Sequence, residues 1–423
     1  MSGALDPGRL GDLRLRPIGD KVLRGERLDP DDGLALYGTS DLLGLGLLAG
    51  WVNARRNGDR VFFSANQHIN PTNVCVLRNT CVFCSFARMP KEEGAYTRSL
   101  DEVYHEAAQA EGQPTSEFHI VGGLHPKLRL QYYTDMIAGL KQRHPSVHIK
   151  ALTAVEIAHL ARIERISERD VLQALKDAGL TSLPGGGAEV FSTAVRATIA
   201  ERKLTGEEWI RVHRTAHELR IPTNCTMLYG HVETAADRIG HLTMLRALQD
   251  ETGGFLTYIP LAYHPDHNQL GEEMGRVGTA TTGYEDLKNI AVARLYLDNV
   301  AHIKTHWPMV TPFLSQIALA FGCDDVEGTV VYERVYHEAG AQTQMHMPYG
   351  ELVRLIRGAG KRPVERNSLY QPVRERFDDT SSGPDARTRV PAPATTAPAT
   401  PAPATPAPAT PAPVVSARAV HAA

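Results

Sequence analysis

The stretch QHINPTNVCVLRNTCVFCSFARM, from Gln67 to Met89, decides how the whole chain is interpreted. It follows directly on the apolar segment Val61–Ile69, whose composition predicts a β-strand. Its three cysteines have the spacing C-x5-C-x2-C, which allows their thiolates to converge within one loop. In a barrel of parallel strands, the loop after a strand lies at the carboxyl end, where active sites are built.

Cys75, Cys81 and Cys84 are open to three interpretations. A structural zinc site commonly pairs two C-x2-C halves, whereas this chain has one such half and His68 would have to act as the fourth ligand. A set of buried thiols fits poorly in a loop rich in Asn, Arg and Thr. A [4Fe–4S] cluster held by three cysteines would leave one iron open for a small ligand, unlike the usual four-thiolate arrangement. The clustering of the thiols favours the iron–sulfur cluster.

Outside the cysteine loop, short apolar runs alternate with longer amphipathic stretches. The predicted strands are Val61–Ile69, Glu117–Val121, Val147–Leu152, Thr181–Leu183, Asn224–Leu228, Phe255–Leu261, Ala301–Lys304 and a weak one at Gly328–Val331. The helical patterns between them include Leu100–Ala110, Gln131–Arg143, Glu168–Ala178, Gly206–Leu219, Ala235–Gln249, Tyr284–Asn299 and Thr311–Phe321. This alternation indicates parallel strands with crossover helices.

Eight such units over about 270 residues match the size of a (β/α)8 barrel of the TIM type. A doubly wound open sheet is the alternative, and the absence of a G-x-G-x-x-G motif after any strand weighs against it. We therefore expect an α/β barrel at 59–345, preceded by a helical extension at 1–58 and followed by a helical extension at 346–373. The remainder, 374–423, is a low-complexity tail, where nine of the 27 prolines lie between Pro391 and Pro413. Such a segment has little to bury and is expected to be disordered.

The charge balance excludes some classes of function. With 45 Lys and Arg against 48 Asp and Glu, the net charge is −3, which argues against bulk attraction to nucleic acid or anionic membranes. The longest apolar run, Leu42–Val52, is shorter than the ~20 residues that a membrane-spanning helix needs. The first twenty residues contain no apolar signal segment, so a cytoplasmic location with reduced thiols is expected.

The cysteine loop ends C-x-F-C-x-F and resembles that of the radical S-adenosylmethionine superfamily, although most members space the cysteines C-x3-C-x2-C. Further motifs occur in order and resemble those of the aminofutalosine synthase family, which belongs to the futalosine route to menaquinone. The resemblance covers about Leu28 to Tyr370. Its motifs are FHIVGGLHP (Phe118–Pro126), KALTAVEI (Lys150–Ile157), LPGGGAEVF (Leu183–Phe191), TNCTMLYGHVET (Thr223–Thr234) and GCDDVEGTVVYERVYHEAGA (Gly322–Ala341).

The resemblance implies a [4Fe–4S] cluster and S-adenosyl-L-methionine, the latter consumed as a co-substrate. In that family an electron from the cluster splits S-adenosylmethionine, and the 5′-deoxyadenosyl radical adds to 3-[(1-carboxyvinyl)oxy]benzoate. Aryl migration and loss of the carboxylate then give 6-amino-6-deoxyfutalosine. The expected partners are this small aromatic dicarboxylate and an electron donor such as flavodoxin or ferredoxin, with no nucleic acid and no membrane insertion.

The resemblance also assigns expected roles to individual residues. Cys75, Cys81 and Cys84 would hold the cluster. The residues expected around S-adenosylmethionine are Phe83, Gly122, Gly123, Thr153, Glu156 and Glu189. For Thr153 and Glu156 the spacing T-x-x-E is equally that of a helix capping box. Substrate contacts are expected from side chains at predicted strand ends, namely His125, Tyr229, His231 and His264.

Two other functions stay open at this point. One is the dehypoxanthine futalosine cyclase of the same pathway, in which the adenosyl group is not incorporated into the product. The other, from a different class, is a zinc-stabilised barrel that binds a ligand without catalysis.

Overall fold

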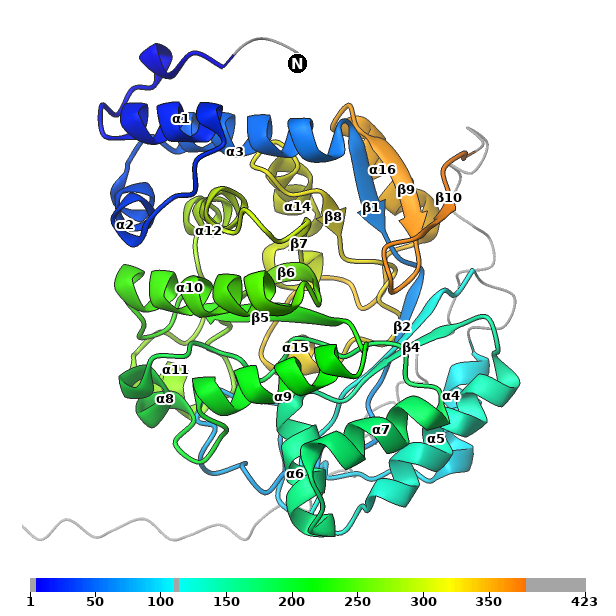
Figure 1. The fold of residues 1–423 in the computed structure, drawn as a ribbon. Coiled ribbons are helices and arrows are strands. Elements are labelled where there is room, and N and C mark those ends of the chain that lie inside the picture. The colour runs from blue at the N-terminus through cyan, green and yellow to red at the C-terminus, as the bar shows by residue number, and fades with distance from the viewer. Residues whose placement is uncertain (1–4, 110–113, 378–423) are drawn as a thin grey trace, which may run out of the picture. The chain divides into compact units, whose positions relative to one another are not determined.

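The fold is a barrel of parallel strands surrounded by helices (Figure 1). The computed structural model describes residues 5–109 and 114–377, so residues 378–423 of the predicted tail lie outside the described residues. The strands that form the barrel are β1 (Arg60–Phe63), β2 (Asn66–Ile69), β3 (Glu117–Ile120), β4 (His148–Ala151), β5 (Thr223–Tyr229), β6 (Phe255–Ala262), β7 (His302–Thr305) and β8 (Asp325–Val326).

Parallel pairing runs around the whole ring. One sheet has the order β2-β3-β4, and β5-β6-β7-β8-β1 follow one another in the second. Isolated parallel bridges join the two sheets: Lys150 pairs with Ser182, Leu183 pairs with Thr223, and Gln67 pairs with Val331. The predicted (β/α)8 barrel is thereby confirmed.

Two predicted strands differ in detail from the structure. The segment Val61–Ile69 forms two strands, because the pairing is interrupted at Ser64 and Ala65. The fourth position, Thr181–Leu183, is represented by two bridge residues and not by a regular strand.

The crossover helices begin where the sequence supplies a capping residue. Ser99, Thr153, Ser167, Thr205 and Thr234 each form a capping box with the acidic residue three positions later. The helices around the barrel are α4 (Leu100–Ala108), α5 (Leu130–Arg143), α6 (Ala154–Glu164), α7 (Glu168–Ala178), α8 (Thr193–Ile199), α9 (Gly206–Glu218), α10 (Ala235–Thr252), α11 (Gln269–Glu273), α12 (Gly283–Tyr296), α13 (Trp307–Val310), α14 (Pro312–Ala318) and α15 (Val335–Glu338).

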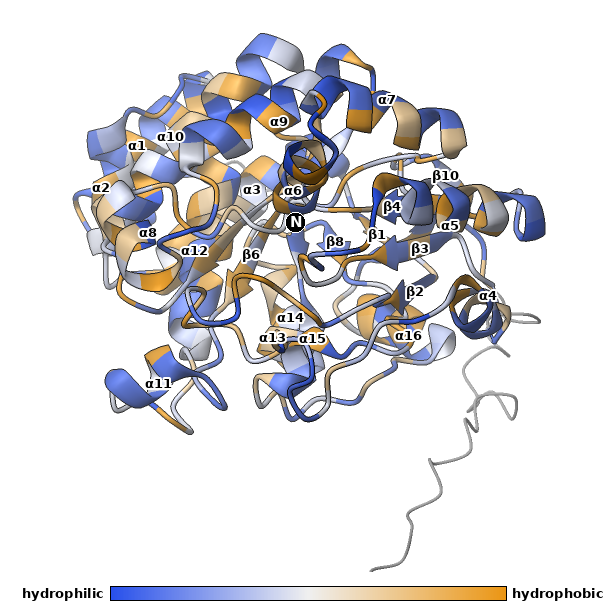
Figure 2. Cartoon of the chain, turned by 90° about the horizontal axis from the view of Figure 1, so that it is seen from below, coloured by the Kyte–Doolittle hydropathy of each residue, from blue (hydrophilic) through white to orange (hydrophobic). Residues whose placement is uncertain are grey.

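The long helices are amphipathic and bury one face. Figure 2 shows the helices around the strands, with hydrophobic and hydrophilic residues on the same helix. In α7, for example, Val171, Leu172 and Leu175 are fully buried, while the other residues are charged, polar or alanine. No helix in the described ranges is long and apolar enough to span a membrane.

Three α-helices precede the barrel, namely α1 (Leu15–Arg24), α2 (Pro30–Gly38) and α3 (Leu42–Asn57), after a short 3-10 turn at Pro7–Arg9. The helical extension expected at 1–58 is therefore divided into several helices, and α2 and α3 are separated at Thr39–Asp41. They pack against α12, where the hydroxyl of Tyr37 donates to Asn289 Oδ1 at 2.9 Å.

The C-terminal extension contains strands as well as the predicted helix. Helix α16 (Tyr349–Gly358) is followed by β9 (Arg362–Arg366) and β10 (Pro372–Arg374). β9 pairs in parallel with the edge of β1 that faces away from β8, and so satisfies backbone groups that would otherwise be unpaired. The buried ion pair of Arg366 with Asp325, at 2.6 Å, fixes β9 to the barrel. The expectation of helix alone for 346–373 is corrected accordingly.

Candidate active site

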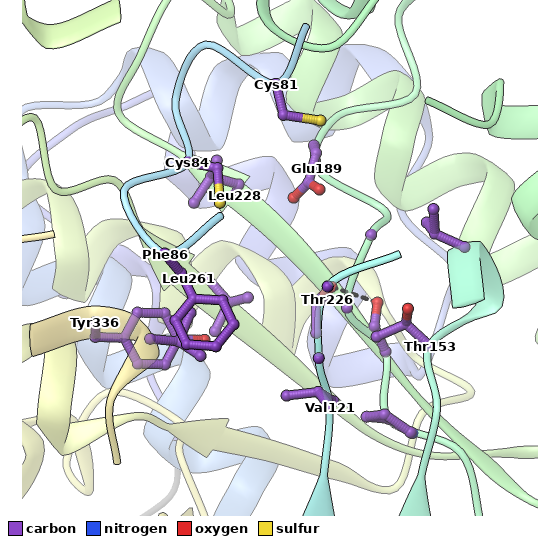
Figure 3. Close-up of a pocket in the computed structure, with 18 of the residues that line it drawn as sticks. Cys81, Cys84, Phe86, Val121, Thr153, Glu189, Thr226, Leu228, Leu261 and Tyr336 are labelled. Atoms are coloured by element: carbon purple, nitrogen blue, oxygen red, sulfur yellow. Dashed lines mark hydrogen bonds between the residues drawn. The ribbon is translucent and has the colours of Figure 1, made fainter. Parts of the chain in front are cut away.

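A cavity of about 280 Å³ lies inside the barrel at the carboxyl ends of the strands. Residues from the ends of β2, β3, β4, β5, β6 and β7, and from the loops that follow them, line it. Figure 3 shows its labelled side chains, with Cys81, Cys84 and Glu189 at one end of the view and Phe86, Leu261 and Tyr336 together at the other. The location is the one at which active sites form in barrels of this type.

All three clustered cysteines line this cavity, and all are free thiols. The loop is held from several sides, because the N–H of Cys75 donates to Arg88 and that of Val82 donates to Ile199 of α8. The guanidinium of Arg88 donates to three successive carbonyls beyond Cys84, those of Ser85, Phe86 and Ala87. The predicted cysteine loop therefore lies at the cavity with its backbone fixed.

The donor set fits an iron–sulfur cluster. Burial raises the pKa of the Cys75 thiol and raises that of Cys81 to about 12. Across the residues the structure describes, no three His, Cys, Asp or Glu side chains surround one point as the ligands of a single ion would. A [4Fe–4S] cluster makes a different demand, because each thiolate binds a separate iron. Three free thiols on one cavity wall meet that demand.

Gly122 and Gly123 press against the cysteine loop. A Cβ at Gly123 would lie 2.3 Å from the carbonyl oxygen of Val74, and a Cβ at Gly122 would lie 2.9 Å from that of Thr72. The N–H of Gly123 donates to the Thr72 carbonyl at 2.8 Å. Both glycines also line the cavity, so they give the loop and a ligand room to approach the end of β3.

Thr153 and Glu156 form the capping box of α6, and only Thr153 lines the cavity. The carboxylate of Glu156 points to the backbone instead. It accepts the N–H of Thr153 at 2.7 Å and the N–H of Gly122 at 3.0 Å. Burial raises the pKa of Glu156 to about 7. Glu156 therefore joins α6 to the loop after β3.

Glu189 lines the cavity and forms a buried ion pair with Lys203. Burial alone would raise the pKa of Glu189, but the Lys203 ammonium outweighs it and holds this pKa below its usual range. The backbone of Glu189 has φ 45°, a left-handed conformation that is uncommon outside glycine and often marks functional sites. The Lys203 ammonium also lies 5.2 Å from the centre of the Phe83 ring. No motif in the sequence singled out Lys203.

The four histidine and tyrosine residues expected to touch substrate do not line the cavity in the described part of the chain. His125 Nδ1 accepts the backbone N–H groups of Lys127 and Leu128. The Tyr229 hydroxyl donates to Asp286, His231 contacts the Leu228 carbonyl, and His264 contacts the Met309 carbonyl. These side chains are hydrogen-bonded to the surrounding structure, and their contact with substrate stays a prediction.

Other polar side chains line the cavity. Those without an expected role in the sequence motifs are His68, His119, Lys203, Asn224, Thr226, His306, Glu327, Glu333 and Tyr336. The rings of His68 and His119 stack, with centroids 4.6 Å apart. Glu327 is paired with the Lys304 ammonium at 3.1 Å. The sequence carries little signal for His68 and His119, because β2 (Asn-Gln-His-Ile) and β3 (Glu-Phe-His-Ile) contain other polar residues beside them.

Comparisons with known proteins identify the family of the chain. The family described as the radical SAM superfamily matches residues 69–245, and the CofH/MqnC C-terminal region matches residues 252–378. Among solved structures, methylornithine synthase superposes with a TM-score of 0.66 at 17% identity, covering 82% of this chain and 97% of that one. The [FeFe]-hydrogenase maturase HydG has a TM-score of 0.66 at 15% identity, covering 84% of this chain and 76% of that one. These two likenesses support the fold.

Curated relatives are closer in sequence. The aminodeoxyfutalosine synthase of Thermus thermophilus is 48% identical over 88% of this chain and 98% of its own length. That of Streptomyces coelicolor is 46% identical over 89% of this chain and 98% of its own. The cyclic dehypoxanthine futalosine synthase of Streptomyces coelicolor is 36% identical over 88% of this chain and 92% of its own. The chain therefore belongs to the radical SAM superfamily and, within it, to the family of the aminodeoxyfutalosine synthases.

Proposed function

We propose that this chain makes 6-amino-6-deoxyfutalosine by joining the adenosyl group of S-adenosylmethionine to 3-[(1-carboxyvinyl)oxy]benzoate. The observation that carries this proposal is the identity of 46–48% to two aminodeoxyfutalosine synthases over almost their whole length. The cysteine loop at the cavity of the barrel agrees with it. Because the identity to the cyclic dehypoxanthine futalosine synthase is lower, at 36%, the synthase is preferred over the cyclase.

Cys75, Cys81 and Cys84 would hold a [4Fe–4S] cluster and leave one iron open to the methionine part of S-adenosylmethionine. When bound, the cluster supplies the electron that breaks the carbon–sulfur bond and releases the adenosyl radical for addition to the substrate. The two extra residues between Cys75 and Cys81 are accommodated by backbone turns, in which Arg78 donates to the Cys75 carbonyl and Cys81 donates to the Leu77 carbonyl. The longer spacing is therefore compatible with all three thiols facing the cavity.

The residues of the chain would bind and orient S-adenosylmethionine beside these cysteines. The backbone at Gly122 and Gly123 is free of side chains, so a ligand can reach the end of β3. The carboxylate of Glu189, kept ionised by Lys203, is suited to accept hydroxyl groups of the ribose. Phe83 would cover part of the nucleoside. These roles follow from position in the cavity.

The cavity would also protect a reactive radical from water. Its walls include buried apolar side chains, among them Phe86, Leu228 and Ile259. Exclusion of water prevents side reactions of reactive intermediates. An enclosed barrel therefore suits an addition in which no hydrogen atom is taken from solvent.

An electron donor such as flavodoxin or ferredoxin would reduce the cluster, and the reaction would take place in the cytoplasm. Cys75 and Cys84 are only partly buried, and the nearby side chains of Val76 and Met89 are each 39% exposed. This gives a small electron-transfer protein a surface close to the cysteine loop.

The proposal is tested by anaerobic reconstitution with iron and sulfide, followed by reduction and addition of both substrates. Mass spectrometry should detect 6-amino-6-deoxyfutalosine and methionine in equal amounts. If dehypoxanthine futalosine is converted instead, and the enolpyruvyl benzoate is left unchanged, the chain is the cyclase. A colourless protein with zinc in place of iron would exclude radical chemistry.

A further inference from the structure

We infer that His68, His119 and His306 form the subsite that binds a carboxylate of the substrate, and that binding is accompanied by proton uptake onto this histidine cluster. The inference rests on the proposed function, because that function defines a substrate with two carboxylates. It extends that function by naming the groups that neutralise the substrate.

The three histidines come from separate parts of the barrel and meet at one cavity. His68 is in β2, His119 is in β3, and His306 follows β7 directly. The rings of His68 and His119 stack at 4.6 Å with an angle of 28° between their planes. His306 contacts the ring of Tyr336 edge-on at 4.8 Å. The cluster is therefore a fixed wall of the cavity.

Two ring nitrogens of the cluster are buried without a partner. His68 and His306 are 6% and 5% exposed, and Nε2 of each has no hydrogen-bond partner. Buried polar groups are nearly always paired in native proteins, so such an atom needs an explanation. Both residues line the cavity, and a ligand with acceptor oxygens would supply the missing partners.

The charge on the cavity lining explains why histidines are needed. Among the described residues, the lining carries the carboxylates of Glu189, Glu327 and Glu333 and one ammonium, that of Lys203. Lys203 is already paired with Glu189, and Lys304, behind the lining, is paired with Glu327. A dicarboxylate entering this cavity meets no unpaired Lys or Arg side chain in the described lining. Among the described lining residues, the histidine rings are the side chains that can still gain a positive charge near neutral pH.

The contact between His306 and Glu327 determines which ring nitrogen is left for the substrate. His306 Nδ1 lies 3.2 Å from the Glu327 carboxylate. Because a carboxylate only accepts, the proton on Nδ1 is donated to Glu327. Nε2 can then donate to a substrate carboxylate only when the ring carries a second proton and becomes an imidazolium. A histidine ring placed between the Glu327 carboxylate and a substrate carboxylate is stabilised as the imidazolium.

The other two rings are neutral before the ligand enters. Burial lowers the pKa of His68, and it holds the pKa of His119 well below its ordinary value. A carboxylate nearby would oppose this effect by favouring the charged ring. The charged and titratable groups that face the cluster from neighbouring elements are Glu117, Lys150, His264, Lys304, Glu327, Glu333 and Tyr336.

The rest of the cavity suits the aromatic part of the same substrate. Phe86, Leu261 and Tyr336 lie together in the view of Figure 3, and all three line the cavity. An aromatic ring can pack on this apolar surface while its carboxylate reaches the histidine cluster.

The test uses the cluster-loaded enzyme without reductant, so that 3-[(1-carboxyvinyl)oxy]benzoate binds but does not react. Calorimetric titration at pH 7.5 in two buffers of different ionisation enthalpy measures the protons exchanged on binding. The wild-type enzyme should take up protons, and His306→Gln should take up fewer and bind roughly 30-fold more weakly. The matched control is His159→Gln, because His159 is on α6, is hydrogen-bonded to the His125 carbonyl, and is not part of the cavity lining.

The outcomes separate this inference from the proposed function. Retention of the bound cluster shows that each variant is folded. If wild-type enzyme makes the product but binds the substrate with no proton uptake, and His306→Gln binds equally well, the inference is overturned and the proposed function stands. If binding takes up protons and depends on His306 while no adenosyl product forms, the subsite stands and the proposed function fails.

Discussion

The carboxylate of Glu156 accepts the backbone N–H of Gly122 at 3.0 Å, and it does so from the first turn of α6. Gly122 and Gly123 in turn lie against the backbone of the loop that carries the cysteines. A single buried carboxylate thus connects a crossover helix, the end of β3 and the cysteine loop. The geometry of the site depends on this chain of contacts.

The first prediction concerns the pH dependence of stability through Glu156. Burial raises its pKa from 4.5 to about 7 in the folded chain. Because the folded pKa is raised, the stability contributed by this group is complete below pH 4.5 and is lost as the pH rises through 7. Glu156→Gln has no such titration. We compare the free energies of unfolding of the wild type and the variant at each pH. The value for the wild type should fall relative to that of the variant by up to about 3 kcal/mol between pH 4.5 and 8. Urea unfolding at several pH values measures it, and a constant difference would contradict the prediction.

The second prediction concerns the three cysteines. Cys75→Ala, Cys81→Ala and Cys84→Ala should each lose the iron–sulfur cluster and all synthase activity, because three thiolates are the minimum that holds it. Cys225→Ala is the control, since this thiol is buried, contacts the Thr257 carbonyl at 3.5 Å and is not itself part of the cavity lining. Iron and sulfide content after anaerobic purification decides the result. Retention of full iron content by a variant of the cysteine loop would refute the assignment.

The third prediction concerns the close approach at Gly123. In Gly123→Ala the new Cβ would lie 2.3 Å from the Val74 carbonyl oxygen, so the cysteine loop has to move. We expect a loss of ~1–3 kcal/mol in unfolding free energy, as for other overpacked sites, and faster loss of iron. Gly240→Ala in α10 is the control, because nothing lies within 4 Å of its added Cβ. Equal stability and equal iron retention in the two variants would show that the close approach is unimportant.

The order of strands and helices could be predicted because it depends on local patterns. The capping residues Ser99, Thr205 and Thr234 mark helix starts in the sequence, and apolar runs mark the strands. Strand β9 could not be predicted in this way. Its sequence, Arg362–Arg366, is rich in charge, and it becomes a strand through pairing with β1, some 300 residues earlier. The ion pair that allows the burial of Arg366 is made with Asp325, 41 residues earlier in the chain, so it is not a local pattern either.

The sequence motifs predicted which cysteines and glycines lie at the cavity better than which polar side chains do. The cysteines, Gly122 and Gly123 belong to contiguous motifs, and the cavity lining includes them all. His125 and His264 were expected at the cavity because they follow strands, but local sequence does not fix the direction of a side chain after a strand ends. Their rings bond to nearby backbone groups instead. The contact of His306 with Glu327, 21 residues later in the chain, is formed by the fold and is not visible as a sequence motif.

The central claim is that the adenosyl group ends in the product, and labelled S-adenosylmethionine tests it most directly. The reduced, cluster-loaded enzyme is incubated with 3-[(1-carboxyvinyl)oxy]benzoate and S-adenosylmethionine carrying 13C in the ribose of its adenosyl group. We predict that the label appears in 6-amino-6-deoxyfutalosine, one labelled ribose for each substrate consumed, with methionine released in equal amount. Label found in free 5′-deoxyadenosine, with no labelled aryl product, would contradict the account.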